Sequence, residues 1–237
     1  MGLEGILGDD CSLVPVLIQA ILTSLKIPKY PLISPNIPKI NPPLNQFKYI
    51  VKFLIALITQ SDQAWSYLAN AETKESKPAY MLWNYFYPLL GIMSLVIFLF
   101  AGWRSPNPEV SFDFQYGMTK MVPVLVAYFV GPYLAMMLIK TMLVNIFDLP
   151  HPDKDRLTNF VFYSTSFLMA IEMLMAVFPA FRFFEFIALY LVYITWNGSH
   201  TYIRVAEKRR WLFGFMSFLV IFFSPSLIQH LLQFLQG

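Results

Sequence analysis

Long apolar runs dominate the C-terminal two-thirds of the chain. Five of them follow one another, and each is long enough to cross a bilayer core of about 30 Å as a helix. Prolines at positions 88, 123, 132 and 225 fall inside the runs and predict kinks that neighbouring helices compensate. The pattern predicts an all-α, polytopic membrane protein with a bundle of about five transmembrane helices. The runs are Tyr80–Trp103, about Met118–Phe147, Asn159–Phe178, about Phe183–Tyr202 and Trp211–Leu235.

The first 45 residues follow a different pattern and are expected to form an N-terminal extension. Cys11–Leu25 is apolar but contains Pro15, and at about 15 residues it is too short to cross a bilayer. We expect a surface or interfacial helix there. Six prolines lie in residues 26–43, and their spacing predicts an extended linker instead of a helix.

Residues 46–79 are expected to form a cytoplasmic amphipathic and polar segment. Within Gln46–Ile58 apolar residues recur at helical spacing, while Lys48 and Lys52 share one side. Such a helix can lie flat on an anionic leaflet or pack against the underside of the bundle. Ser61–Ala79 is polar and predicts a solvated helix or loop.

Composition agrees with a membrane protein and excludes several other classes. Hydrophobic residues make up 57% of the 237 residues and charged residues 13%, against about 25% charged residues in an ordinary globular chain. The net charge of +3 is small, and the basic residues lie in separate clusters, which argues against a nucleic-acid partner. Cys11 is the only cysteine, so neither an intramolecular disulfide nor a cysteine-based metal site can form.

The distribution of lysine and arginine predicts the orientation. Thirteen of them flank the runs on one side, whereas the other side receives only Arg104, Lys120 and Arg182. The positive-inside rule then places the N-terminus in the cytoplasm and the C-terminus outside. Lys140 falls near the inner end of the second run, where its side chain can reach the interface.

Two carboxylates lie in the apolar runs and are the clearest candidates for chemistry. Glu172 and Glu185 are costly in a membrane and are functional candidates for that reason. Arg182 lies three residues before Glu185, on one helix face with it. Two interpretations remain open, a structural ion-pair cluster that holds the third-to-fourth hairpin and a proton or ion relay.

A basic cluster follows the fourth run. Arg204, Lys208, Arg209 and Arg210 lie directly on the predicted cytoplasmic side. The cluster serves as a topological anchor, as a docking surface for anionic lipid headgroups, or as both.

The remaining polar residues give no indication of a metal site or a cofactor site, and we do not expect the protein to be an enzyme. His151, Asp153 and Asp155 occupy a short loop with the spacing of solvated charge, and Gln229 and His230 near the chain's end suit hydrogen bonds between helices. The chain also lacks H-E-x-x-H, G-x-S-x-G, P-loop and Rossmann motifs.

From about Phe47 to its end the chain resembles the Yip family, five-span membrane proteins named for interacting with Ypt/Rab GTPases, and in particular the bacterial branch. The resemblance implies a multi-pass protein of the bacterial inner membrane that acts as a membrane-organising or protein-interaction module. The blocks that carry it are Gln63–Trp65, Trp83–Gly91, Phe178–Pro179 and Leu189–Gly198.

Two functional hypotheses follow. In the first, a non-enzymatic Yip-type protein meets membrane or cytoplasmic proteins through its N-terminal region and the Arg204–Arg210 loop. In the second, it is a small transporter or permeation subunit in which Glu172 and Glu185 act as a relay. The lipid bilayer is a partner in both, and five spans leave room for a homo-oligomer.

Overall fold

The chain divides into two compact units, Met1–Asn45 and Gln46–Gly237. The first unit lies almost wholly outside the described residues, as do the expected surface helix and proline-rich linker. The computed structural model describes residues 44–70, 77–106, 110–145, 153–180 and 184–236.

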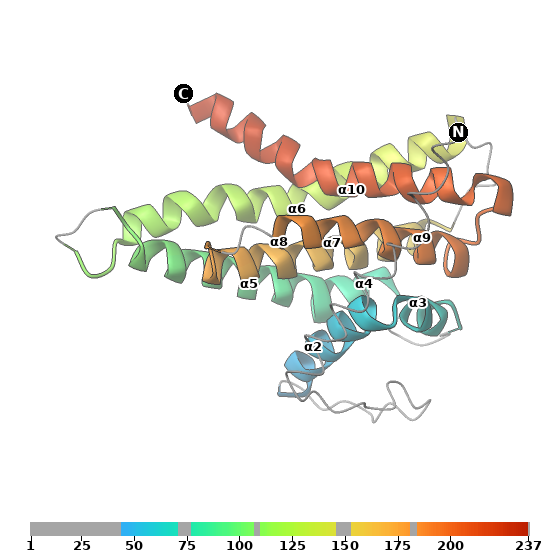
Figure 1. Cartoon of the computed structure of the whole chain (residues 1–237), viewed down its shortest axis with the longest axis horizontal. Helices are drawn as coiled ribbons and strands as arrows, with labels where there is room; N and C mark the ends of the chain where they lie inside the picture. The colour runs from blue at the N-terminus through green and yellow to red at the C-terminus, as the bar shows by residue number, and fades with distance from the viewer. Residues whose placement is uncertain (1–43, 71–76, 107–109, 146–152, 181–183, 237) are drawn as a thin grey trace, which may run out of the picture. The chain divides into compact units, whose positions relative to one another are not determined.

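Every regular element in these described ranges is a helix (Figure 1). One is a π-helix, η3, and one is a 3₁₀-helix, η4. The elements are α2 (Leu44–Thr59), α3 (Ser61–Asn70), α4 (Pro78–Met81), η3 (Leu82–Phe86), α5 (Tyr87–Trp103), α6 (Phe114–Asn145), α7 (Lys154–Val177), α8 (Phe184–Ile187), η4 (Ala188–Tyr190), α9 (Leu191–Thr201) and α10 (Glu207–Gln236).

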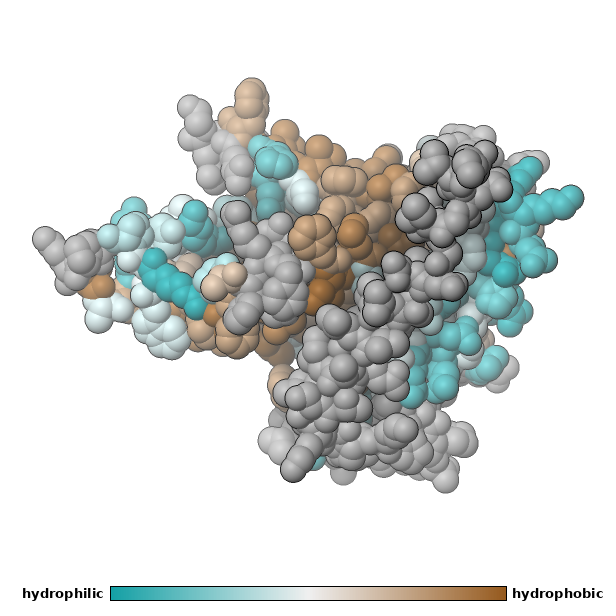
Figure 2. All heavy atoms as spheres, viewed as in Figure 1, coloured by the Kyte–Doolittle hydropathy of each residue, from teal (hydrophilic) through white to brown (hydrophobic). Residues whose placement is uncertain are grey.

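Four stretches of helix are long and apolar enough to cross a membrane. They correspond to the first, second, third and fifth apolar runs, so these runs are confirmed as long helices. Figure 2 shows apolar side chains over the middle of the bundle and hydrophilic side chains toward its two ends. The stretches are Pro78–Trp103, Phe114–Met142, Lys154–Val177 and Glu207–Leu232.

The fourth predicted run is not among these four stretches, and a count of five spans is therefore not confirmed. Its described residues form α8, η4 and α9 in succession. The 3₁₀ turn tightens the chain at Tyr190, whose hydroxyl donates to the Ile58 carbonyl at 2.8 Å.

Helix α7 is the centre of the bundle. It contacts α5, α6, α9 and α10, and 61% of its 18-residue apolar core is buried against 33–39% in the other three long stretches. All residues from Leu157 to Met169 are buried, on every side of the helix. One of its polar groups is paired with a neighbouring element, since Ser166 Oγ lies 2.8 Å from the Tyr85 hydroxyl.

Helix α2 packs against the bundle, which is one of the two roles expected for residues 46–58. Phe53 is buried, and its ring centroid lies 4.5 Å from that of Tyr163 and 5.5 Å from that of Tyr85. Lys48 and Lys52 are exposed. Whether this helix also touches a leaflet stays a prediction.

Helix α3 was predicted to be solvated, and this is wrong for one of its faces. Trp65 is fully buried, and its Nε1 donates to the Ile194 carbonyl of α9 at 3.0 Å. A methyl group added at Gly198 would lie 2.6 Å from the Phe160 ring and 2.9 Å from the Trp65 ring, so glycine leaves room for both. At the end of α9, Thr201 Oγ1 donates to Asp62 Oδ1 at 2.7 Å. The segment is therefore a docked part of the fold.

The opposite end of the bundle is held by Arg104, just after α5. Its guanidinium donates to the Ala176 carbonyl and, at 2.6 Å, to the Val177 carbonyl. These carbonyls lie in the last turn of α7, where backbone oxygens lack helical partners and a cation is favourable. Arg104 therefore joins the C-terminal ends of α5 and α7.

Trp65→Phe should lower the free energy of unfolding by about 1–2 kcal/mol, because it removes a buried hydrogen bond and part of a packed ring. Trp83→Phe is the matched control, since Trp83 is 72% exposed. Denaturant titration in mild detergent measures both. Equal losses in the two variants would contradict the role given to Trp65.

Asp113 caps α6 and should titrate below its usual range. Its carboxylate accepts from the Tyr116 backbone N–H and from the Ser105 hydroxyl, both at 2.8 Å, and these bonds lower the pKa of Asp113. A depressed pKa means that the cap is present above the ordinary pKa of 3.8 and is lost as the pH falls through the lowered value.

NMR of the Tyr116 amide checks this. Its chemical shift should titrate with a midpoint below 3.8, and Asp113→Asn, which keeps an acceptor oxygen but cannot ionise, should abolish the titration. A midpoint at or above 3.8 would show that the two bonds do not stabilise the charged form.

Candidate functional site

A cavity of about 330 Å³ opens between α6, α7, η4 and α10. Four polar side chains line it, and they come from three helices: Tyr128 from α6, Glu172 from α7, and Ser226 and Gln229 from α10. The rest of the lining is apolar, with Pro225 on α10. Glu172 is the only acidic residue beyond the first turn of any of the four long described stretches. The apolar lining residues are Leu168, Ile171, Met175, Ala188, Phe222 and Pro225.

The cavity lies where a proline interrupts α10. Pro225 has no N–H, so it leaves the Ile221 carbonyl without its helical partner. The hydroxyl of Ser224 donates to this carbonyl at 3.3 Å and restores part of the lost bonding. The lining residue Phe222 precedes the proline and Gln229 follows it, so the cavity spans the interruption.

Gly131 brings α6 close to α10 at the same place. A methyl group added there would lie 3.2 Å from both the N and the Cα of Pro225, which is tighter than side-chain carbons normally approach a backbone. The glycine therefore sets the distance between the two helices beside the cavity.

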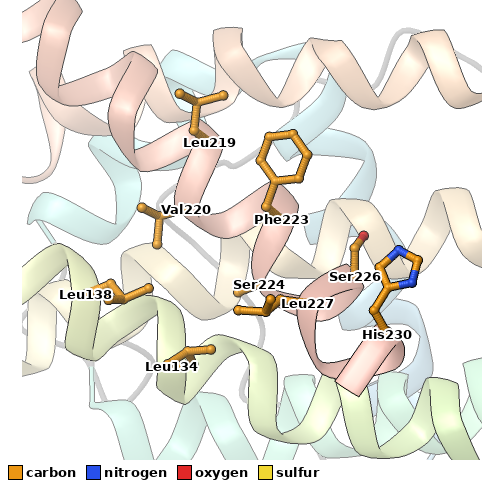
Figure 3. A pocket seen from close by; sticks show the side chains of 9 residues that line it. All are labelled: Leu134, Leu138, Leu219, Val220, Phe223, Ser224, Ser226, Leu227 and His230. Atoms are coloured by element: carbon orange, nitrogen blue, oxygen red, sulfur yellow. The ribbon is translucent and has the colours of Figure 1, made fainter. Parts of the chain in front are cut away.

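A second, wider hollow of about 690 Å³ runs along α6 and α10 (Figure 3). Leu134 and Leu138 form its α6 side, and most of its α10 residues are apolar. Ser226 and His230 lie together at one end of this groove. Ser226 lines both the groove and the Glu172 cavity.

The predicted acidic cluster is placed only in part. Glu172 lines the cavity, whereas Arg182 and the side chain of Glu185 lie outside the described residues. The choice between an ion-pair cluster and a relay stays open on these grounds. Lys140 is exposed two residues before the end of the stretch Phe114–Met142.

The predicted basic cluster lies at the other end of the bundle. Arg204, Lys208 and Arg209 are exposed and Arg210 is half-buried. The loop that holds Arg204 is fixed by backbone bonds, since the N–H groups of Tyr202 and Ile203 donate to Gly198 and that of Val205 donates to Ser199. Arg204 itself has φ of 62°, in the left-handed region.

Sequence reasoning missed Tyr128 and Ser226 as neighbours of Glu172. The available signal was weak: Ser226 and Gln229 are one helical turn apart directly after Pro225, in an otherwise apolar helix. Tyr128 carries no such signal, because its run is rich in aromatic residues. Among the described residues no group of three or more His, Cys, Asp and Glu side chains could hold a metal ion.

Comparison with known proteins gives no family for this chain. No family model, no curated protein and no solved structure matches it.

Gly131→Ala should destabilise the fold and alter the cavity, because the added methyl group pushes against the backbone of Pro225. We expect a loss of about 1–3 kcal/mol in unfolding free energy. Gly91→Ala is the control, since a methyl group there meets nothing within 4 Å. This variant should be neutral or should gain about 0.5–1 kcal/mol from helix propensity.

Denaturant unfolding in detergent distinguishes the two variants. If Gly131→Ala were as stable as Gly91→Ala, the close approach of α6 and α10 at Pro225 would not be a constraint on the fold.

Proposed function

We propose that the chain is a non-enzymatic integral membrane protein of the bacterial branch of the Yip family that acts as a membrane-organising or protein-interaction module. One observation carries the proposal: α3 is docked on α9 directly beside the exposed basic loop. We name α2, α3, the Tyr202–Ala206 loop and the first turn of α10 together the inner face.

The docking of α3 supports the family assignment. Two of the blocks on which the resemblance rests meet here, because Trp65 of the first block bonds to Ile194 of the last and packs over Gly198. The block that opens the first span contributes Tyr85, which contacts Phe53 of α2. The blocks that carry the resemblance to the Yip family thus have a common structural role, although they lie far apart in the sequence.

The conformation of Arg204 supports a role for its side chain. A left-handed backbone costs a residue with a Cβ about 1–2 kcal/mol, and glycine would avoid this cost. The surrounding backbone bonds hold the strained residue in place and leave the guanidinium exposed. Strain of this kind often marks a contact site. An anionic surface, on a lipid or on a protein, is the complementary partner.

We further propose five spans, with α8, η4 and α9 together as the fourth. On this reading the N-terminus is cytoplasmic, the C-terminus is outside, and the membrane is the bacterial inner membrane. The charge distribution supports this orientation, because Lys154, Arg156 and the Arg204–Arg210 cluster gather at the inner end, whereas Arg104 and Lys120 are at the other.

The proposal is tested by cross-linking in native membranes with a tag on the N-terminus. Arg204→Gln, Lys208→Gln and Arg209→Gln together should reduce cross-linking to protein partners by roughly tenfold or more, because each cation near an anionic surface is worth about 1 kcal/mol. Arg210 is left intact because it is half-buried.

Lys120→Gln is the control, since this exposed lysine lies at the opposite end of the bundle. A C-terminal tag verifies that the variants insert normally. An unchanged set of cross-linked partners in a correctly inserted triple variant would overturn the role of the inner face.

A further inference from the structure

Four aromatic side chains form a continuous row on the surface of η3, α5 and α6. The ring centroids of Trp83 and Tyr87 are 5.3 Å apart, and those of Tyr87 and Phe129 are 6.0 Å apart. Tyr133 extends the row, with its ring centroid 6.0 Å from that of Phe129. Trp83, Phe129 and Tyr133 are 72%, 45% and 37% exposed, and Tyr87 is half-buried. We name these four residues the aromatic face.

The aromatic face lies well inside the apolar part of the bundle. Tyr87 is nine residues from the start of the stretch Pro78–Trp103, and Tyr133 is nine residues from the end of the stretch Phe114–Met142. At 1.5 Å per residue, both positions lie about 14 Å from the same end of the bundle. This depth rests on the proposed membrane location. With both stretches crossing a hydrocarbon core of about 30 Å, the aromatic face contacts lipid tails and not water.

The two tyrosines of the aromatic face leave one hydrogen-bond donor unused. The hydroxyl oxygens of Tyr87 and Tyr133 lie 2.8 Å apart, and either hydroxyl can donate to the other. One bond uses one of the two hydroxyl hydrogens, and neither hydroxyl has a further partner in the described part of the chain. Lipid tails offer no acceptor, and a donor left without one in hydrocarbon is costly. The second hydrogen therefore calls for an acceptor on another molecule.

The surroundings of the two hydroxyls define the chemistry of that molecule. A carbonyl oxygen matches the spare donor, because it has two lone pairs and no hydrogen of its own. Exposed aromatic rings favour another flat ring beside them, in an offset or edge-to-face arrangement. The surface next to Tyr87 is open, since Gly91 on the same side of α5 has no atom within 4 Å of the point where a Cβ would lie.

We propose that the aromatic face binds an isoprenoid quinone. One ring carbonyl accepts the spare tyrosine hydrogen, the ring packs against Trp83 and Phe129, and the isoprenoid tail lies among the lipid tails. A quinone of this class combines the three required properties, which are a flat ring, a carbonyl acceptor and solubility in hydrocarbon.

A second copy of the chain is the less suitable occupant. Helices that pack together in membranes approach each other through small residues, whereas large rings dominate this surface. None of the four residues belongs to the inner face, so the proposal shares only the membrane location with the function proposed above.

The probe is tritiated menaquinone with a short isoprenoid tail. Equilibrium binding is measured on the full chain in phosphatidylcholine nanodiscs, against empty nanodiscs that correct for quinone dissolved in the lipid. We expect saturable binding. An analogue with the same tail on a naphthalene ring that lacks both carbonyls should not displace the probe, because it offers no acceptor.

Variants of the two tyrosines test the hydrogen bond. Tyr87→Phe together with Tyr133→Phe keeps both rings and removes both hydroxyls, and we expect it to weaken binding by roughly tenfold or more. Each single variant keeps one hydroxyl with its hydrogen free, so each should bind within about threefold of the unaltered chain. Tyr193→Phe is the matched control, because Tyr193 is 48% exposed on α9 and lies outside the aromatic face.

Size-exclusion profiles and unfolding midpoints establish that each variant is folded. If the double variant fails this check, Phe129→Leu replaces it, with a loss of affinity expected from the missing ring. Quenching by phospholipids with brominated acyl chains tests the depth separately, as the difference between the unaltered chain and Trp83→Phe. Absence of this quenching would count against the membrane location and therefore also against the proposed function.

The binding results decide the quinone site alone. The proposal is overturned if the unaltered chain shows no saturable binding, if the carbonyl-free analogue competes as well as menaquinone does, or if the folded double variant binds with unchanged affinity. A dimer of the unaltered chain that the double variant dissociates would assign the aromatic face to a second copy instead.

Discussion

The enclosure of α7 is the constraint on which the other helices depend. Polar side chains on α7 find no hydrogen-bond partners in lipid, so their partners come from its own backbone, as for Thr165, or from neighbouring helices. Asn159 donates to the Tyr202 hydroxyl at 3.1 Å, and Ser166 pairs with Tyr85. The first of these bonds fixes the end of α9 against α7, and the second fixes the start of the first long stretch. Both bonds also define which face of each partner helix turns inward.

The two ends of the bundle are closed by the same kind of interaction, a side-chain N–H that donates to a backbone carbonyl of another helix. Trp65 does this at one end through Ile194, and Arg104 does it at the opposite end through Ala176 and Val177. The two differ in environment, because the indole is fully buried and the guanidinium is exposed. A buried donor is costly to remove, whereas the strength of the exposed one depends on charge and on the end of α7.

The sequence predicted the long helices well because apolar length is a local property. It did not predict that α7 is central. The Ser, Thr and Asn residues inside the third run are the feature that indicates contact with protein on all sides. The docking of α3 was missed because a polar average conceals one buried face, that of Trp65. The bond from Tyr190 to Ile58 could not be predicted, because the two residues lie far apart in the sequence. Glu172 could be singled out from its run, but its neighbours Tyr128 and Ser226 could not, since three separate helices bring them together.

The cavity and the inner face can change shape independently, because the segment of α10 after Pro225 makes few contacts with the other helices. Leu227, Leu231 and Phe234 are 58%, 54% and 83% exposed, so few protein contacts oppose a movement of these turns. The first half of α10 is different, since Phe213 and Ile221 are fully buried. Any change of shape at the cavity should therefore move the last turns of α10. The bond from Trp65 to α9 should keep the inner face in its present conformation. A signal from one site to the other would need a second arrangement of α7, and the burial of its residues from Leu157 to Met169 makes such an arrangement costly.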